Sequence, residues 1–162
     1  MKCYVIENKI FKDHRGTYRK LYGKDTMPEG LNLEFVEVDV SFSWEGALRG
    51  IHSDNKAWKL VSCIKGTMFL VIVDCDKSSK TFGEFESFHL TDRDERSVLV
   101  PPNHGVAHLA LTQFVMFHYL QSEPYDINRQ TTYKWDDPKF AIPWPVNEPL
   151  LSERDRGAKL CE

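Results

Sequence analysis

The sequence predicts an all-β sandwich or barrel. Apolar runs are short and rich in Val, Ile, Phe, Leu and Tyr, and turn-forming residues separate them at intervals of roughly ten residues. Helical periodicity is weak, apart from a turn near residues 25–29 and another near 126–130. The chain has 162 residues, 41% of them hydrophobic and 28% charged, which is enough to bury one sizeable core. An α/β arrangement is therefore rejected, and residues 1–162 are expected to form one domain.

The clearest strand is predicted at residues 68–73, where six nearly continuous apolar residues follow the turn pair Lys65-Gly66. Such a run indicates burial on both faces. Apolar and acidic residues alternate over residues 33–40, so one face of this strand should meet the core while the other lines water or a cavity. Further strands are predicted at residues 59–64, 84–90, 97–100 and 114–120.

The chain becomes rich in proline after Trp135. Proline cannot donate to a sheet ladder and it interrupts helices, so this segment cannot form a regular central strand or helix. It is expected to run as an ordered strap over the surface, because it carries apolar anchors. These are Trp135, Phe140, Ile142 and Trp144.

Charge and composition exclude several classes of protein. The 21 Lys and Arg residues are scattered and are balanced by 24 Asp and Glu, so the footprint of a nucleic-acid binder is absent. No stretch approaches the roughly 20 apolar residues that span a bilayer, so no membrane partner is expected. Glu7 lies where a signal peptide needs its apolar region, which favours a cytoplasmic location. The cysteines are widely separated and are expected to be reduced thiols.

Two pairs of residues have types and spacings that suit catalysis or metal binding. Arg49 precedes His52 by three residues, so one could hold an anion while the other moves a proton. His104 and His108 have a spacing that would suit two zinc ligands on a helix, but they follow two prolines and lack the Glu of metalloproteases. A metal site inside a jelly roll stays open on these residues alone.

Short motifs then occur in one collinear order along nearly the whole chain. They are FKDHRGTY at 11–18, LRGIH at 48–52, KLV at 59–61, TFG at 81–83, VPP at 100–102, AH at 107–108, Tyr119 and Tyr125 six residues apart, WDDP at 135–138, IPWP at 142–145 and LSERD at 151–155. In this set and order the sequence resembles the dTDP-4-dehydrorhamnose 3,5-epimerases.

The resemblance implies a cupin-type jelly roll, that is, a double-stranded β-helix. It also implies a homodimer, no metal or other cofactor, and a nucleotide-linked 4-keto sugar as substrate. A ketone at C4 acidifies the hydrogens at C3 and C5, so inversion needs a base, a stabiliser for the enolate oxygen and an acid on the other face. By match to the family pattern, His52 is the base, Asp155 orients it, Lys59 stabilises the enolate and Tyr119 is the acid.

The same resemblance implies roles in substrate binding. Arg15 and Arg49 match arginines that hold the diphosphate, for which forked donors are suited. Tyr125 is expected to flank the sugar, and His108 matches a second histidine in the sugar pocket.

The sequence also departs from the family pattern. Lys20 stands where an acidic residue is expected, and Glu37 and Asp39 stand where the family usually has Gln and Asn. These positions bind the nucleotide side of the substrate in relatives, so a different base or ribose is predicted. Leu70 replaces an Asp that would partner His108. These departures suggest a divergent epimerase acting at C3 and C5, or at C3 alone, of a GDP-linked 4-keto heptose for capsule polysaccharides.

Two functions of other kinds also fit the resemblance. A 3,4-ketoisomerase would use a His and an enolate on the same scaffold, but its product would keep a carbonyl at C3. A non-catalytic sugar-nucleotide binding module or a metal-dependent cupin would share the fold alone.

Overall fold

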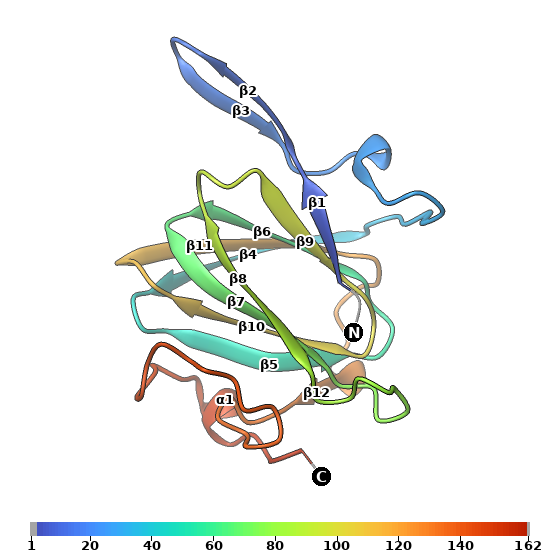
Figure 1. Cartoon of the computed structure of the whole chain (residues 1–162), viewed down its shortest axis with the longest axis vertical. Helices are drawn as coiled ribbons and strands as arrows, with labels where there is room; N and C mark the ends of the chain where they lie inside the picture. The colour runs from blue at the N-terminus through green and yellow to red at the C-terminus, as the bar shows by residue number, and fades with distance from the viewer. Residues whose placement is uncertain (1–2, 162) are drawn as a thin grey trace.

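The computed structural model describes residues 3–161, and its body is built from two antiparallel five-stranded sheets (Figure 1). The order in the first sheet is β1 (Tyr4–Glu7), β9 (Arg96–Val100), β6 (Lys59–Lys65), β11 (Phe114–Gln121) and β4 (Glu37–Trp44). The order in the second sheet is β12 (Gln130–Thr132), β5 (Leu48–Asp54), β10 (His104–Ala110), β7 (Thr67–Asp74) and β8 (Phe85–Thr91). The all-β, cupin-type jelly roll expected from the sequence is confirmed.

Strand β7 is buried on both faces, as its apolar run predicts. Met68, Leu70 and Ile72 are fully buried in the main core cluster. The alternate residues, such as Phe69 and Val71, pack in a second cluster with the C-terminal segment. At about 25 cal/mol per Å² of apolar surface removed from water, strands of this kind contribute a large share of the stability.

Strand β4 differs from the prediction for residues 33–40. It begins at Glu37 and extends to Trp44, and its acidic and serine side chains are on the inward face, where Ser43 is buried. The apolar side chains face outward, with Val38 61%, Phe42 55% and Trp44 70% exposed. Alternation gives a strand two chemically distinct faces, but it does not determine which face turns inward. Here a polar pocket lies on the inner side, so the polar face is the inner one.

A hairpin of β2 (Lys9–Asp13) and β3 (Gly16–Lys20) extends away from the body (Figure 1). Its turn contains Gly16, whose φ of 133° is a backbone conformation that suits glycine. Phe11 and Tyr18 are 61% and 67% exposed on the hairpin. This hairpin was not predicted, because its residues are mostly polar and give no hydrophobic pattern.

The C-terminal segment runs as the predicted strap. Phe140 is buried, and the Trp144 indole Nε1 donates to the Trp135 carbonyl at 2.7 Å while its ring meets the edge of Phe69. The two helical turns are confirmed as the 3₁₀ helices η1 (Lys24–Thr26) and η2 (Ile127–Arg129). A one-turn helix that was not predicted, α1 (Glu153–Arg156), ends the strap. No helix within residues 3–161 has the length and apolar character needed to cross a membrane.

Candidate active site

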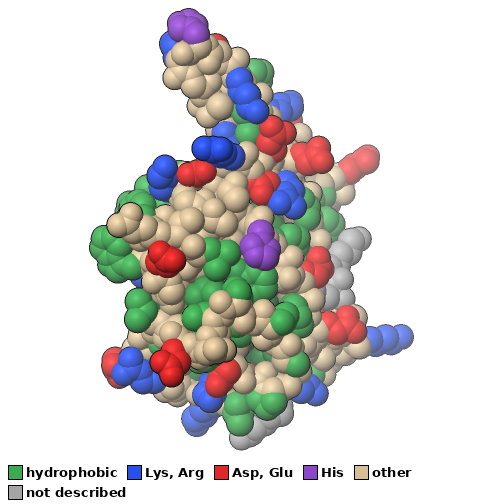
Figure 2. Space-filling view, turned by 60° about the vertical axis from the view of Figure 1, so that its left-hand side comes forward, with side chains coloured by type: hydrophobic (Ala, Val, Ile, Leu, Met, Phe, Trp, Pro, Cys, Tyr) green, Lys and Arg blue, Asp and Glu red, His purple; other side chains and the backbone are tan. Residues whose placement is uncertain are grey.

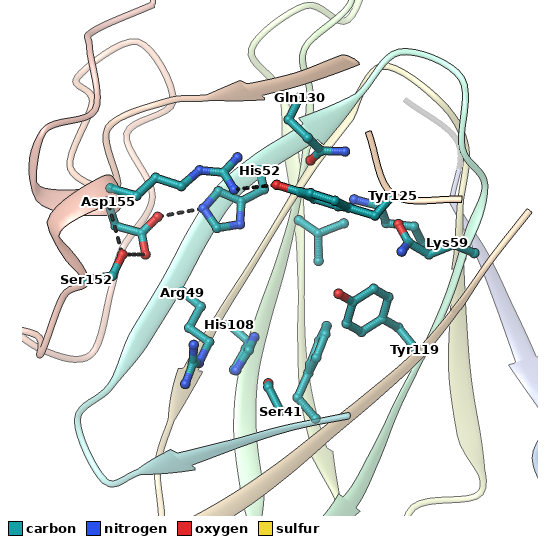
Figure 3. A pocket seen from close by; sticks show the side chains of 14 residues that line it. Ser41, Arg49, His52, Lys59, His108, Tyr119, Tyr125, Gln130, Ser152 and Asp155 are labelled. Carbon is teal, nitrogen blue, oxygen red and sulfur yellow. Dashed lines mark hydrogen bonds and ion pairs between the residues drawn. The ribbon is translucent and has the colours of Figure 1, made fainter. Parts of the chain in front are cut away.

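A pocket of about 330 Å³ opens between the two sheets and takes side chains from β4, β5, β6, β10, β11 and α1 (Figure 3). Its lining residues are Ser41, Arg49, His52, Lys59, Val106, His108, Phe117, Tyr119, Gln121, Tyr125, Gln130, Ser152, Arg154 and Asp155. Seven of the eleven predicted site residues therefore meet at one cavity, namely Arg49, His52, Lys59, His108, Tyr119, Tyr125 and Asp155.

His52 of β5 is held by Asp155 of α1, with His52 Nε2 2.6 Å from Asp155 Oδ1. The other Asp155 oxygen accepts a hydrogen bond from the Ser152 hydroxyl at 2.8 Å, and the Asp155 backbone N–H donates back to Ser152, the helix N-cap. Burial raises the pKa of Asp155, but hydrogen bonds from His52 and Ser152 outweigh it and hold the pKa below its usual value. An ionised Asp155 fixes the ring through Nε2–H, so that the neutral imidazole carries its free lone pair on Nδ1.

Tyr119 of β11 and Lys59 of β6 lie on the opposite sheet from His52 (Figure 3). Burial, followed by the nearby Asp39 and Glu37 carboxylates, raises the pKa of Tyr119 to about 12. Lys59 is only 9% exposed, and burial lowers the pKa of its ammonium, although the Asp54 carboxylate partly opposes this. The pocket thus has an imidazole on one wall and a phenol and an amine on the other.

His108 is a buried, neutral member of the pocket. It is 2% exposed, and its ring stacks on Phe117 with 4.1 Å between centroids. Its strand neighbour on β7 is Leu70, and within the described residues its Nε2 has no hydrogen-bond partner. Burial, followed by the charges of Arg49 and His52, lowers the pKa of His108 to about 3. Leu70 therefore stands beside His108 where an orienting carboxylate was expected, as the sequence predicts.

The low pKa of His108 predicts acid sensitivity. His108 binds a proton near pH 6.5 in the unfolded chain but only near pH 3 in the folded chain. The free energy of unfolding is therefore highest above pH 6.5 and decreases as the pH falls toward 3. The loss should be on the order of 5 kcal/mol across that window. Urea unfolding at several pH values is the measurement, and His108→Leu should show a shallower decline than the wild type. Equal slopes for both proteins would contradict the prediction.

Arg49 and Arg154 supply positive charge to the pocket. Arg49 donates through Nε to the Ser43 hydroxyl at 3.0 Å and through a terminal nitrogen to the Phe42 carbonyl at 3.1 Å. Arg154 donates to the Thr132 hydroxyl at 2.8 Å, and its terminal nitrogen lies 3.5 Å from the Tyr125 hydroxyl. These hydrogen bonds hold the two guanidinium groups in position, so that their remaining N–H groups can bind an anion.

Four predicted binding residues do not line this pocket. Glu37 and Asp39 lie on the inward face of β4 and accept hydrogen bonds from Gln121, which does line the pocket. Arg15 forms an ion pair with Asp13 at the exposed hairpin, and Lys20 pairs with Asp25. Arg15 lies at the turn of the hairpin, which extends away from the body of its own chain, whereas Lys20 lies at the base of the hairpin (Figure 1).

Sequence reasoning gave no role to several lining residues. Gln121 and Phe117 could have been found, since side chains two apart on a strand share a face and Tyr119 was already placed toward the sugar. Arg154 and Ser152 stand beside Asp155 in the quoted LSERD motif. Gln130 carried no signal, because it reaches the pocket only through the pairing of β12 with β5.

The possible zinc pair is not assembled. His108 lines the pocket, whereas His104 Nδ1 lies 3.0 Å from the Pro102 carbonyl and its ring borders a different hollow. Among residues 3–161, no group of three or more His, Cys, Asp or Glu is arranged to hold a metal ion.

Comparisons with known proteins agree with this geometry. A relative from Methanothermobacter thermautotrophicus, a dTDP-4-dehydrorhamnose 3,5-epimerase, is 34% identical over 161 residues, covering 96% of this chain and 87% of its own. The structure of the 3,5-epimerase RmlC from Legionella pneumophila, in complex with dTDP-4-keto-L-rhamnose, superposes with a TM-score of 0.92 at 31% identity and covers 98% of this chain and 87% of that one.

A second kind of epimerase is equally similar in structure. ChmJ, a 3'-monoepimerase from Streptomyces bikiniensis in complex with dTDP-quinovose, gives a TM-score of 0.91 at 31% identity, with 98% of this chain and 83% of that one covered. The family model for dTDP-4-dehydrorhamnose 3,5-epimerase matches residues 1–162. With its jelly roll, its pocket and these relatives taken together, the chain belongs to the dTDP-4-dehydrorhamnose 3,5-epimerase family of isomerases.

Proposed function

We propose that this protein inverts C3, C5 or both in a nucleotide-linked 4-keto sugar. The observation that carries the proposal is the pairing of His52 with Asp155 on one wall of a pocket whose opposite wall holds Tyr119. An epimerase needs a base and an acid on opposite faces of one carbon, and these two groups come from opposite sheets.

In the proposed reaction, His52 removes the proton next to the C4 ketone through the ring nitrogen that Asp155 leaves free. The electrons move to the ketone oxygen, and the Lys59 ammonium stabilises the resulting enolate, an interaction that strengthens when water is excluded. Tyr119 then donates its hydroxyl proton to the carbon from the other face. Asp155 orients His52 and stabilises the imidazolium that forms.

The diphosphate of the substrate is assigned to arginine. Arg49 lines the pocket, and Arg154 adds a second cation at the same cavity. His108, being neutral, offers the sugar a polar edge without a charge, and the half-exposed Tyr125 ring can cover the sugar. Forked guanidinium donors match phosphate oxygens in pairs, which fixes the orientation of the substrate.

The protein is further proposed to act as a homodimer. The exposed apolar side of β4, with Val38, Phe42 and Trp44, is large for a surface that remains in water. Hydrophobic side chains also gather on the face seen in Figure 2, below the hairpin. In a dimer the hairpin of a second copy could carry Arg15 to this pocket, which would reconcile its expected role with its position.

Light scattering tests the homodimer directly. The expected mass is twice the chain mass of 18.9 kDa, because pairing would remove the apolar side of β4 from water. Phe42→Lys should shift the mass toward one chain, since it places a charge in the proposed contact. A monomeric wild type at micromolar concentration would contradict the proposal.

The nucleotide is proposed to be dTDP, because the similar structures of RmlC and ChmJ are complexes with dTDP sugars. The predicted preference for a GDP-linked heptose rested on Lys20, Glu37 and Asp39, and none of these lines the pocket of its own chain. A GDP-linked 4-keto heptose is therefore the second substrate to be tested.

The decisive experiment offers both nucleotide-linked 4-keto sugars to the enzyme in deuterated water. Mass spectrometry counts the exchanged positions, and proton NMR gives the stereochemistry of the product. Inversion of the dTDP compound is expected, and inversion of the GDP compound alone would overturn the choice of nucleotide. A product with its carbonyl at C3 would identify a ketoisomerase, and binding without exchange would identify a non-catalytic module.

Tyr119→Phe should separate the two halves of the reaction. The variant keeps the ring and loses the only hydroxyl assigned to the second face, so net inversion should fall by roughly a hundredfold or more. Deuterium exchange through His52 should persist. NMR of substrate incubated in deuterated water measures both, and full inversion by the variant would show that Tyr119 is not the acid.

A further inference from the structure

Two carboxylates beside Tyr119 have no part in the mechanism above. In the ladder between β4 and β11, Asp39 pairs directly with Tyr119, and Glu37 pairs directly with Gln121. Side chains that are directly opposite in an antiparallel pair share one face and lie in contact. The two acidic side chains are therefore neighbours of the proposed acid, on the inner side of the edge strand.

Gln121 holds the two carboxylates together. Its amide nitrogen, which has two N–H groups, donates to Glu37 Oε1 at 2.8 Å and to Asp39 Oδ2 at 3.1 Å. Gln121 is 1% exposed, and the second Glu37 oxygen accepts the backbone N–H of Tyr125 at 3.0 Å. The pair is thus a built feature of the pocket wall, fixed by three hydrogen bonds.

Close carboxylates favour sharing a proton. Burial, followed by the charge of Glu37, raises the pKa of Asp39, which lies directly opposite Tyr119 in the ladder. The same surroundings raise the pKa of Tyr119 to about 12. A phenolate left on Tyr119 after it protonates the sugar would lie against negative charge, so it is strongly disfavoured at neutral pH unless the proton is replaced at once.

We propose that Asp39, supported by Glu37, returns a proton to Tyr119 as Tyr119 protonates the sugar. The Tyr119 O–H bond breaks as the new C–H bond forms on the enolate carbon. The phenolic oxygen takes the proton of the Asp39 carboxyl, and the carboxylate pair then recovers a proton from water. Asp39 acts through Tyr119 and does not touch the sugar, so it is a positioning and relay residue. The inference rests on the proposed epimerase function.

The relay predicts a specific pH dependence for inversion. The groups that face Asp39 are Glu37 on its own strand, Tyr119 and Gln121 on β11, and Lys59 on β6. The charge of Asp39 acts to raise the pKa of the Lys59 ammonium. The relay needs the proton of the Asp39 carboxyl, and rising pH removes it. The fraction of enolate that is inverted should therefore fall as the pH rises through the pKa of Asp39.

The ratio of inversion to exchange isolates this step. Both outcomes start from the same enolate, with His52 already protonated, so the ratio does not depend on the titration of His52. In Asp39→Asn, an isosteric change, exchange in deuterated water should stay near the wild-type rate. The inversion-to-exchange ratio should fall by roughly tenfold or more and should lose its pH dependence.

Two further variants complete the test. Glu37→Gln removes the neighbouring charge, so the decline in the ratio should move to lower pH. The matched control is Glu34→Gln, which neutralises an exposed carboxylate just before β4 that pairs only with Lys24 among the described residues and should leave the ratio unchanged. Exchange by each variant shows that its site is folded.

The outcomes separate this inference from the function beneath it. If wild-type protein neither exchanges nor inverts any 4-keto sugar, the epimerase proposal fails. If wild-type protein inverts but Asp39→Asn and Glu37→Gln both keep its ratio and pH profile, the relay is wrong and the epimerase stands.

Discussion

Replacing His52 by Ala is expected to abolish epimerisation while leaving nucleotide binding nearly intact. The imidazole is positioned by a buried carboxylate, with 2.6 Å between His52 Nε2 and Asp155 Oδ1. Removal of a general base costs roughly a hundredfold to ten-thousandfold in rate. Exchange at C3 and C5 in deuterated water should vanish together with inversion, because both begin with the same proton abstraction.

Two comparisons make the His52 result specific. Calorimetric titration with dTDP should give similar affinities for the variant and the wild type, since Arg49 and Arg154 are untouched. His104→Asn removes an imidazole that borders a different hollow and should retain activity. Activity that survived His52→Ala but disappeared with a chelator would replace this mechanism with metal-dependent chemistry.

Replacing Lys59 by Met is expected to lower kcat by on the order of a hundredfold or more, because the enolate oxygen loses its cation. Lys59 is 9% exposed, and methionine has a similar length, so the packing around the start of β6 should be kept. Exchange and inversion should fall together, since both pass through the enolate. Steady-state rates with the 4-keto sugar are the measurement.

The pH profile gives a second test of Lys59. Burial lowers the pKa of this ammonium, so its charge is lost as the pH rises through a value below the usual lysine range. Activity should therefore decline on the alkaline side earlier than an ordinary lysine would cause. Lys59→Arg should be less active but should keep its remaining activity at higher pH, because a guanidinium stays charged.

The control for both Lys59 experiments is Lys56→Met. Lys56 is an exposed lysine in the loop just before β6, ion-paired with Glu123 at 3.1 Å, and surface pairs of this kind contribute little to stability. Its replacement should leave the rate and the pH profile unchanged. An equal loss in both variants would point to a general effect of charge and not to the enolate.

Much of the fold was predictable, because hydrophobic runs and prolines in the sequence indicate local structure directly. The run at 68–73 is apolar without alternation, and only a strand covered on both sides suits such a run, as β7 is by the core and the strap. The prolines after Trp135 excluded regular structure there, and the aromatic anchors indicated that the segment is ordered. The β2–β3 hairpin was missed because it buries little, and its polar residues give no hydrophobic pattern.

The site was predicted less completely, for a related reason. Motifs identified residues such as His52, Lys59 and Tyr119 one by one, but they did not say how the residues meet. Asp155 reaches His52 across 103 residues of sequence, through a one-turn helix whose cap is Ser152. Arg15 belonged to an equally clear motif, yet it lies at the turn of the hairpin and does not line the pocket of its own chain.

The sequence by itself predicted the class of structure, through local periodicity, and the family, through motifs in one collinear order; the same motifs supplied the side chains that are proposed to react. Only the tertiary structure decided which face of β4 turns inward, and with it the position of Glu37 and Asp39 beside Gln121 and Tyr119. Alternation is symmetric about a strand, so the choice between its two faces is made by what packs against it.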